Sequence, residues 1–281
     1  MMNINDKDYE EISSTAIVTS YPRIFTDIPY EKEIYECLEK NSHELVTLNK
    51  KLAPEIEARY KLANQILDKY NIKQVFELAA GYTSRGLIYS KKGYNYVEMD
   101  LDGVSQKKCD IIKSIVKEIP ETLHIISGNA LRINDYKQID NYFNKEENVA
   151  VLNEGLLRYL TFAEKKKVSE NIYSVLKQYG GIWITCDCTP KNFITVQDKV
   201  MPDINKNLNN ITSRNDLNDR FKDINHVKDF FGEIGFNVVE VHKFSEVKND
   251  LYSMNYHGIT DEHIDQLLEN GITIVLKIAE N

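Results

Sequence analysis

Apolar positions along the chain follow two alternating periods. Short, nearly continuous apolar runs are typical of buried strands, and runs that recur every three to four residues are typical of helices that pack on one face. The run at 148–152 is the most continuously apolar, which fits a central strand of a parallel sheet. The short runs predict strands at 74–78, 94–100, 123–127, 148–152, 182–186, 237–241 and 271–278.

Helical patterns fill most of the intervals between these strands. A capping-box pair, Thr161 and Glu164, predicts the start of one long helix, and Gly180 predicts its end. Pro120 predicts the end of another helix at Ile119. The expected helices begin near 83 and cover 102–119, 162–179, 226–234 and 261–268.

This alternation predicts an α/β protein with a doubly wound, mostly parallel seven-stranded sheet. The last two strands have no ordinary crossover helix between them, which indicates that these two strands pair antiparallel at the sheet edge. One domain over residues 1–281 is the simplest organisation, because no repeat and no second core is visible. Its expected parts are a mobile start (1–12), an N-terminal helical cover (13–71), a core (72–189), a lid or substrate insertion (190–225) and a C-terminal part (226–281).

The first strand leads into a glycine turn that is suited to a ligand. Glu77 and Gly81 form an E-L-x-x-G pattern, and Asp100 ends the next strand about 20 residues later. An acid at that place can accept hydrogen bonds from ribose hydroxyls. The pattern lacks the G-x-G-x-x-G that a pyrophosphate requires, which argues against a nicotinamide-dependent oxidoreductase. Taken alone, each residue also fits a strand end or a helix cap, but together they favour an adenosyl ligand such as S-adenosylmethionine.

Further polar residues stand where other strands end. Asn129 could hydrogen-bond an adenine edge, or it could only stabilise a turn. Arg23 could form a forked pair with a carboxylate, or it could be a surface cation. Asp187 is a candidate general base for a hydroxyl or amine acceptor, or else a cap for its turn. Tyr159 either lines an acceptor pocket or belongs to the core. These two are the only catalytic candidates.

Composition limits the possible partners. The 281 residues include 35 Lys and Arg against 43 Asp and Glu, a formal charge of −8, which argues against nucleic acid as the main partner. The histidines form no zinc-binding pattern, so we expect no metal. Cys186 and Cys188 would share one face of a strand as small buried side chains. The polar start and the lack of a long apolar run predict a cytoplasmic protein without a membrane segment. The sequence carries no signal for an oligomeric state.

Four segments together resemble the leucine carboxyl methyltransferase family, within the class I S-adenosylmethionine-dependent methyltransferases. Residues 15–23 resemble its T-A-x-x-x-x-x-R element, and 76–85 its E-L-G-A-G-x-D-T-R loop. Residues 97–100 resemble its E-x-D. The most diagnostic match is 153–160, which resembles E-G-x-x-x-Y-L. The resemblance implies a Rossmann-like fold, S-adenosylmethionine as cofactor and S-adenosylhomocysteine as product.

The resemblance also assigns roles to single residues. Arg23 would bind the cofactor carboxylate, Gly81 would lie under its methionine part, and Asp100 would hold the ribose. Glu154 would face the amino group or the sulfonium side. The cofactor-binding candidates are therefore Arg23, Glu77, Gly81, Asp100, Asn129, Leu131 and Glu154.

The chain departs from the family pattern at three positions. Ala79 replaces the first loop glycine, Tyr82 replaces an aspartate, and Asn129, which would flank adenine together with Leu131, stands where the family has aspartate. We expect an O-methyltransferase acting on a carboxylate or hydroxyl of a small molecule or peptide. The altered loop motivates an alternative, a methyltransferase-like module that binds the cofactor or regulates without turnover.

Overall fold

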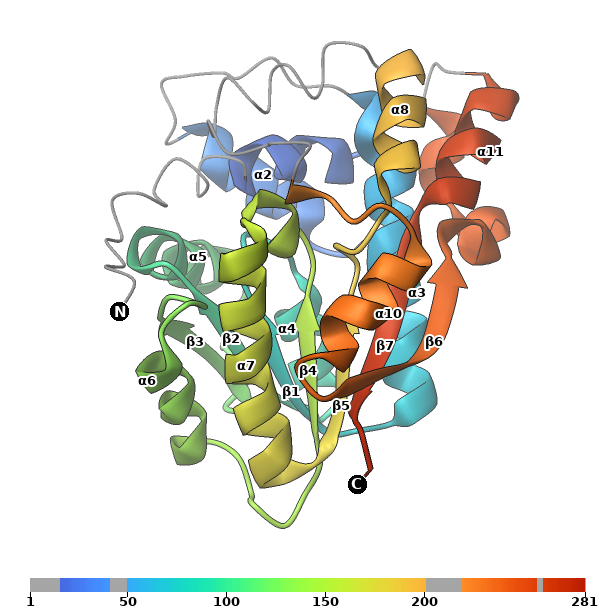
Figure 1. The fold of residues 1–281 in the computed structure, drawn as a ribbon. Coiled ribbons are helices and arrows are strands. Elements are labelled where there is room, and N and C mark those ends of the chain that lie inside the picture. The colour runs from blue at the N-terminus through green and yellow to red at the C-terminus, as the bar shows by residue number, and fades with distance from the viewer. Residues whose placement is uncertain (1–15, 41–49, 201–218, 257–259, 281) are drawn as a thin grey trace.

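A seven-stranded sheet forms the centre of the protein (Figure 1). The computed structural model describes residues 16–40, 50–200, 219–256 and 260–280. The expected mobility of residues 1–12 lies outside these ranges. The strands are β1 (Gln74–Leu78), β2 (Asn95–Asp100), β3 (Leu123–Ser127), β4 (Val149–Asn153), β5 (Gly181–Thr185), β6 (Phe236–Lys243) and β7 (Ile272–Ile278).

The strand order is β3-β2-β1-β4-β5-β7-β6. The pairs from β3 through β5 are parallel, and β7 runs antiparallel to both β5 and β6. The predicted fold class, a doubly wound and mostly parallel sheet with an antiparallel last strand, is confirmed. All residues of β1 and β4 are buried, as their apolar runs indicated.

Helices cover both faces of this sheet. In Figure 1, α7 and α10 lie in front of the strands, and α2 and α8 lie beyond one end of them. Short 3₁₀ segments are η1 (Lys50–Leu52), η2 (Lys137–Asn141), η3 (Leu157–Tyr159), η5 (Phe244–Asp250) and η6 (Tyr252–Asn255). The α-helices are α2 (Glu31–Lys40), α3 (Ala53–Tyr70), α4 (Arg85–Lys91), α5 (Asp102–Ile115), α6 (Ile133–Tyr136), α7 (Phe162–Tyr179), α8 (Lys191–Val200), α10 (Ile224–Gly232) and α11 (Asp261–Asn270).

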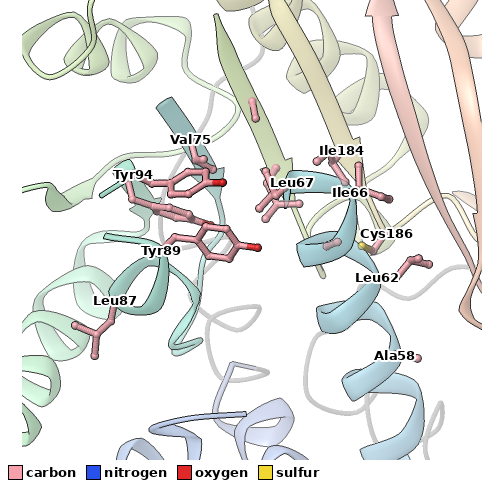
Figure 2. Packing of buried hydrophobic residues seen from close by; sticks show 14 of the residues in the cluster. Ala58, Leu62, Ile66, Leu67, Val75, Leu87, Tyr89, Tyr94, Ile184 and Cys186 are labelled. Carbon is pink, nitrogen blue, oxygen red and sulfur yellow. The ribbon is translucent and has the colours of Figure 1, made fainter. Parts of the chain in front are cut away.

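Two apolar layers hold these helices on the sheet. One layer joins α6, α7 and α10 to the strand side chains on their face, around Trp183 and Phe231. The other joins α2, α3, α4, α5 and α11 to the opposite face. Figure 2 shows part of this second layer, where Leu62 and Ile66 of α3 lie beside Ile184 of β5. The predicted Thr161–Glu164 capping box is present at the start of α7.

The helix predicted over 102–119 ends earlier than expected. α5 stops at Ile115, because Val116 takes extended backbone angles (φ −123°, ψ 145°). Pro120 disfavours a helical conformation in the residue before it, so the last turn had little support. The apolar side chains of Val116 and Ile119 still pack against the second layer, which explains why the periodic pattern continued past the helix.

The two cysteines near the end of β5 do not share a face, which corrects the sequence prediction. Cys186 belongs to the apolar layer of α3, where Figure 2 labels it, and Cys188 belongs to the layer of α7. β5 ends at Thr185, so the alternation rule for strands no longer applies to these residues. Both are free and buried, as expected of small apolar side chains.

The sheet has an irregular edge at β6. Its pairing with β7 shifts register between Val238 and Glu240, which is the sign of a β-bulge. On the same strand, Glu240 accepts hydrogen bonds from Lys69 (2.7 Å) and Tyr70 (2.8 Å) of α3. The end of α3 is thereby tied to this edge.

Replacing Gly181 by alanine tests the close approach of β5 to β4. Gly181 has φ +108°, and an added Cβ would lie 2.0 Å from the carbonyl oxygen of Val149. We expect Gly181→Ala to lower the free energy of unfolding by more than about 2 kcal/mol, from backbone strain and steric overlap. The control is Gly103→Ala in α5, where an added Cβ meets nothing within 4 Å, and which should gain about 0.5–1 kcal/mol. Urea unfolding measures both changes, and equal effects would contradict the prediction.

Candidate active site

A cavity opens at the carboxyl ends of β1, β2, β3 and β4. It encloses about 1010 Å³ of space, including the part that is open to solvent. Loops that follow four parallel strands supply most of its wall, and the segment 16–23 and helix α3 supply the rest. The predicted residues on its wall are Arg23, Gly81, Asp100, Asn129, Leu131, Glu154 and Tyr159. This is the place where open α/β sheets bind ligands.

The glycine turn after β1 is fixed to the end of β2. Ala79 and Gly81 both have left-handed backbone angles, with φ values of 50° and 53°. The amide of Gly81 donates a hydrogen bond of 2.7 Å to Asp100, whose other carboxylate oxygen accepts from the amide of Leu101 at 2.7 Å. Burial raises the pKa of the Asp100 carboxyl, although these two hydrogen bonds oppose the rise. Each oxygen retains a lone pair, so Asp100 can still accept a further donor from the cavity.

Glu154 lies at the centre of a buried cluster of arginines. Arg85 donates to one carboxylate oxygen at 2.7 Å, and Arg23 and Arg59 each approach the other oxygen to 3.5 Å. Burial alone would raise the pKa of the Glu154 carboxyl, but the three guanidinium groups outweigh it and hold the pKa at about 2. Glu154 is therefore ionised under all ordinary conditions.

Arg23 occupies the end of a helix over residues 16–23 and is only 4% exposed. Its guanidinium lies between Glu154 and Glu31, with the Arg23 Nε 3.9 Å from a Glu31 oxygen. Within the described ranges this buried Nε has no hydrogen-bond partner. Arg23 thus lines the cavity as a loosely held cation, which is what a carboxylate ligand requires.

Glu77 does not lie on the cavity wall. Its side chain is 1% exposed and is bound by Arg85 and by the hydroxyl of Tyr96, which donates at 2.7 Å. Because Arg85 also binds Glu154, Glu77 supports the cluster from below. Glu77, the acid of the E-L-x-x-G pattern, therefore lies beneath the cavity and does not contact a ligand in it directly.

Asp187, the candidate base, is fully engaged by the loop after β4. Its carboxylate accepts from the amides of Gly155 (2.7 Å), Leu156 (2.7 Å) and Leu157 (2.9 Å), and from the side-chain amide of Asn153 (2.6 Å). The other role that the sequence suggested for Asp187 was a cap for the turn that follows it. The structure shows a cap for a different turn, the one that carries Glu154 and leads to η3.

Asn129 and Leu131 lie in one tight turn after β3. The Asn129 side chain accepts from the amide of Leu131 at 3.0 Å, and the amide of Asn129 donates to Asp135 at 2.8 Å. Both residues line the cavity. Tyr159 on η3 is 4% exposed and also reaches the cavity wall. Asn129 thus shapes its turn and faces the cavity at once, so its two expected roles are compatible.

Three arginines were missed as site residues by the sequence analysis. Arg59 lies on α3, four residues after Glu55, to which it is paired at 3.6 Å. Arg85 begins α4 and joins Glu77 to Glu154, and Arg158 on η3 lines the cavity. The i, i+4 spacing of Glu55 and Arg59 on α3 was the available signal. The positions of Arg59 and Arg158 on the cavity wall, and that of Arg85 beneath it, depend on long-range packing.

In the part of the chain that the structure describes, no group of three or more acidic, histidine or cysteine side chains is arranged to hold a metal ion. In the same ranges no helix is both apolar enough and long enough to cross a bilayer.

Comparison with solved structures places the fold among Rossmann-like methyltransferases. A DUF574 family protein from Streptomyces avermitilis is 12% identical with a TM-score of 0.60, and 95% of this chain and 97% of that chain are covered. A candidate methyltransferase from Thermobifida fusca is 13% identical with a TM-score of 0.59, with 94% of each chain covered. At these identities the likeness concerns the fold. No curated protein sequence matches the chain.

A comparison with family models identifies the sequence family of this chain. The model of the family described as leucine carboxyl methyltransferase matches residues 30–173, about half of the chain. The protein therefore belongs to the leucine carboxyl methyltransferase family, as the four motif segments indicated. The match includes β1, β2 and β4 with the glycine turn, Asp100 and Glu154.

Replacing Glu154 by glutamine should destabilise the fold in a pH-dependent manner. At pH 7 we expect a loss of about 3–5 kcal/mol in the free energy of unfolding, because three buried arginines lose their shared counter-charge. The folded-state pKa of about 2 lies below the ordinary 4.5, so this stabilisation is complete above pH 4.5 and is lost as pH falls toward 2. Urea unfolding between pH 7 and pH 3 measures the difference between the parent and the variant.

The matched control is Glu146→Gln, which changes an exposed acid to the same amide. It should alter stability by less than about 0.5 kcal/mol at any pH. A Glu154→Gln effect as small as that of the control, or one that grows as pH falls, would show that the arginine cluster does not depend on the Glu154 charge.

Proposed function

We propose that this protein is an S-adenosylmethionine-dependent O-methyltransferase. One observation carries the proposal: a single cavity holds the glycine turn, Asp100 and the Glu154–arginine cluster side by side. An adenosyl amino acid offers the complementary groups, which are ribose hydroxyls, an ammonium group and a carboxylate. The family membership of the chain supports the same activity.

The residues present fit this cofactor. Asp100 has lone pairs left for the ribose hydroxyls, and Arg23 offers a buried Nε without a partner in the described ranges to a carboxylate. Glu154 supplies the negative charge that favours an ammonium or sulfonium group. When bound, the cofactor supplies a methyl group that its sulfonium already activates.

The protein's own contribution is then alignment and exclusion of water. An acceptor carboxylate is ionised at neutral pH and needs no general base. This fits the site, because backbone amides already occupy the carboxylate of Asp187, the candidate general base. The polar side chains that η3 presents to the cavity are those of Arg158 and Tyr159. We therefore favour a carboxylate of a small molecule or peptide as the acceptor, ahead of a hydroxyl.

The conformation of Ala79 bears on the alternative function, a module that binds the cofactor without turnover. An alanine with φ 50° carries about 1–2 kcal/mol of backbone strain, yet the turn keeps the left-handed shape that glycine would adopt freely. The second change, Tyr82, is buried, and burial raises the pKa of its hydroxyl to about 12, so it lies against the cavity as a neutral group. The altered loop thus retains the backbone shape needed for a ligand, so the observation that motivated the alternative does not weigh against cofactor binding.

Ligand titration tests cofactor binding. Isothermal titration with S-adenosylmethionine and with S-adenosylhomocysteine should give saturable heat, and both ligands should raise the melting temperature by mass action. ATP and NADH serve as controls, because the site has no glycine-rich pyrophosphate loop. Absence of heat and of thermal protection at millimolar S-adenosylhomocysteine would refute the proposal. Binding without methylation of any carboxylate or phenol would favour the non-catalytic alternative.

Substitution of Asp100 by asparagine tests the ribose contact. Asp100→Asn should weaken S-adenosylhomocysteine binding by about 1–3 kcal/mol, or about 5- to 150-fold in Kd, because a charge-assisted acceptor is lost in a buried site. Asp102→Asn is the matched control, since Asp102 is exposed and binds Ser127 and Gln106 outside the cavity. Equal Kd values for the two variants would remove Asp100 from the cofactor site.

A further inference from the structure

A second, smaller cavity adjoins the first one. It encloses about 330 Å³, including the part open to solvent, and lies between α3, the end of β5 and the start of α8. Arg59 and Arg158 line both cavities, so the two spaces share a wall at the end of the first cavity that holds Glu154 and Tyr159. The second cavity is therefore next to the region where methyl transfer would occur.

Positive charge dominates this second space. Arg59, Arg158 and Arg220 line it together with two acids, Glu55 and Asp187. Both acids are already engaged. Glu55 accepts from Gln197 at 2.7 Å and pairs with Arg59, and Asp187 is held by the loop after β4. Neither acid forms an ion pair with Arg158 among the described residues, and the attraction of Asp187 for Arg220 is smaller than the opposing effects of burial and of Arg158.

Arg158 repels the charge of Arg220 in the second cavity. Arg158 makes no ion pair among the described residues, and its buried Nε has no hydrogen-bond partner there. Burial lowers the pKa of the Arg220 guanidinium to about 9, and repulsion from Arg158 acts in the same direction. Arginine remains protonated at neutral pH, so the site holds two cations that an anion would stabilise.

We propose that Arg158 and Arg220 bind an oxyanion group of the methyl acceptor, a carboxylate or a phosphate that is separate from the oxygen to be methylated. Guanidinium groups recognise both anions through paired hydrogen bonds. Arg158 lines both cavities, so an acceptor whose nucleophile lies in the first cavity can place its anionic end against Arg158. This inference rests on the proposed function, and it narrows the acceptor to molecules with at least one additional negative charge.

Anion binding to the intact protein tests the proposal. Glutarate and inorganic phosphate serve as probes, and Kd is measured by titration in the presence of saturating S-adenosylhomocysteine. We expect at least one probe to bind the parent protein, and Arg158→Gln to weaken that probe by about tenfold or more. Tighter glutarate binding would indicate a carboxylate on the acceptor, and tighter phosphate binding would indicate a phosphate ester.

Two controls separate recognition from a structural role. Lys145→Gln removes an exposed cation that lines neither cavity and should leave the Kd of both probes unchanged. Without ligand, Arg158→Gln should unfold at the same or higher urea concentration than the parent, since repulsion from Arg220 is relieved, whereas a structural arginine would lower it. Arg158→Lys, which keeps the charge, should bind the probe more tightly than Arg158→Gln.

The proposal is overturned if neither anion binds, or if the parent protein and Arg158→Gln bind both anions equally. Failure of S-adenosylhomocysteine to bind the parent protein is a different result. It would refute the proposed function, and the anion titrations repeated without that ligand would still decide whether Arg158 forms an anion site.

Discussion

The structure depends on one buried carboxylate. Glu154 receives Arg23 from the N-terminal segment, Arg59 from α3 and Arg85 from the start of α4, so it joins four parts of the chain at one point. Arg85 also lies 4.4 Å from the ring of Tyr60, which adds a cation–π contact inside the same cluster. Because an uncompensated buried charge is costly, each of these segments is held to the others, and the cavity is largely formed before any ligand arrives.

Most of the sheet could be predicted from apolar periodicity. The bounds of β1 and β3 agree with the predicted runs, because turn residues flank both strands closely. The predicted bounds were wrong where the apolar pattern and the secondary structure end at different residues. Ile119 packs like a helix residue although α5 ends at Ile115, and β6 extends to Phe236 and Lys243, beyond its apolar run. Local patterns report burial, and the backbone conformation at an element's end depends on neighbours that are distant in sequence.

The same distinction explains which site residues were predictable. Gly81, Asp100 and Glu154 follow strands, and strand ends of a parallel sheet meet at one edge, so their convergence on the cavity could be expected. The partners of Glu77 and Asp187 could not be read in this way. Arg85 reaches back under β1, and Asp187 crosses to the loop after β4. Arg59 lies on a helix that resembles ordinary core, and only its packing brings it to Glu154.

The irregular edge at β6 bears on strand pairing between molecules. Val239 and Val241 on this strand are 44% and 41% exposed, a composition that would favour pairing with a strand of another molecule. The bulge between Val238 and Glu240 bends the strand, and the charged groups of Glu240, Lys69 and His242 lie along it. Such bends and charges disfavour the straight ladder of an aggregate, so an apolar edge is kept from acting as a template for amyloid-like growth.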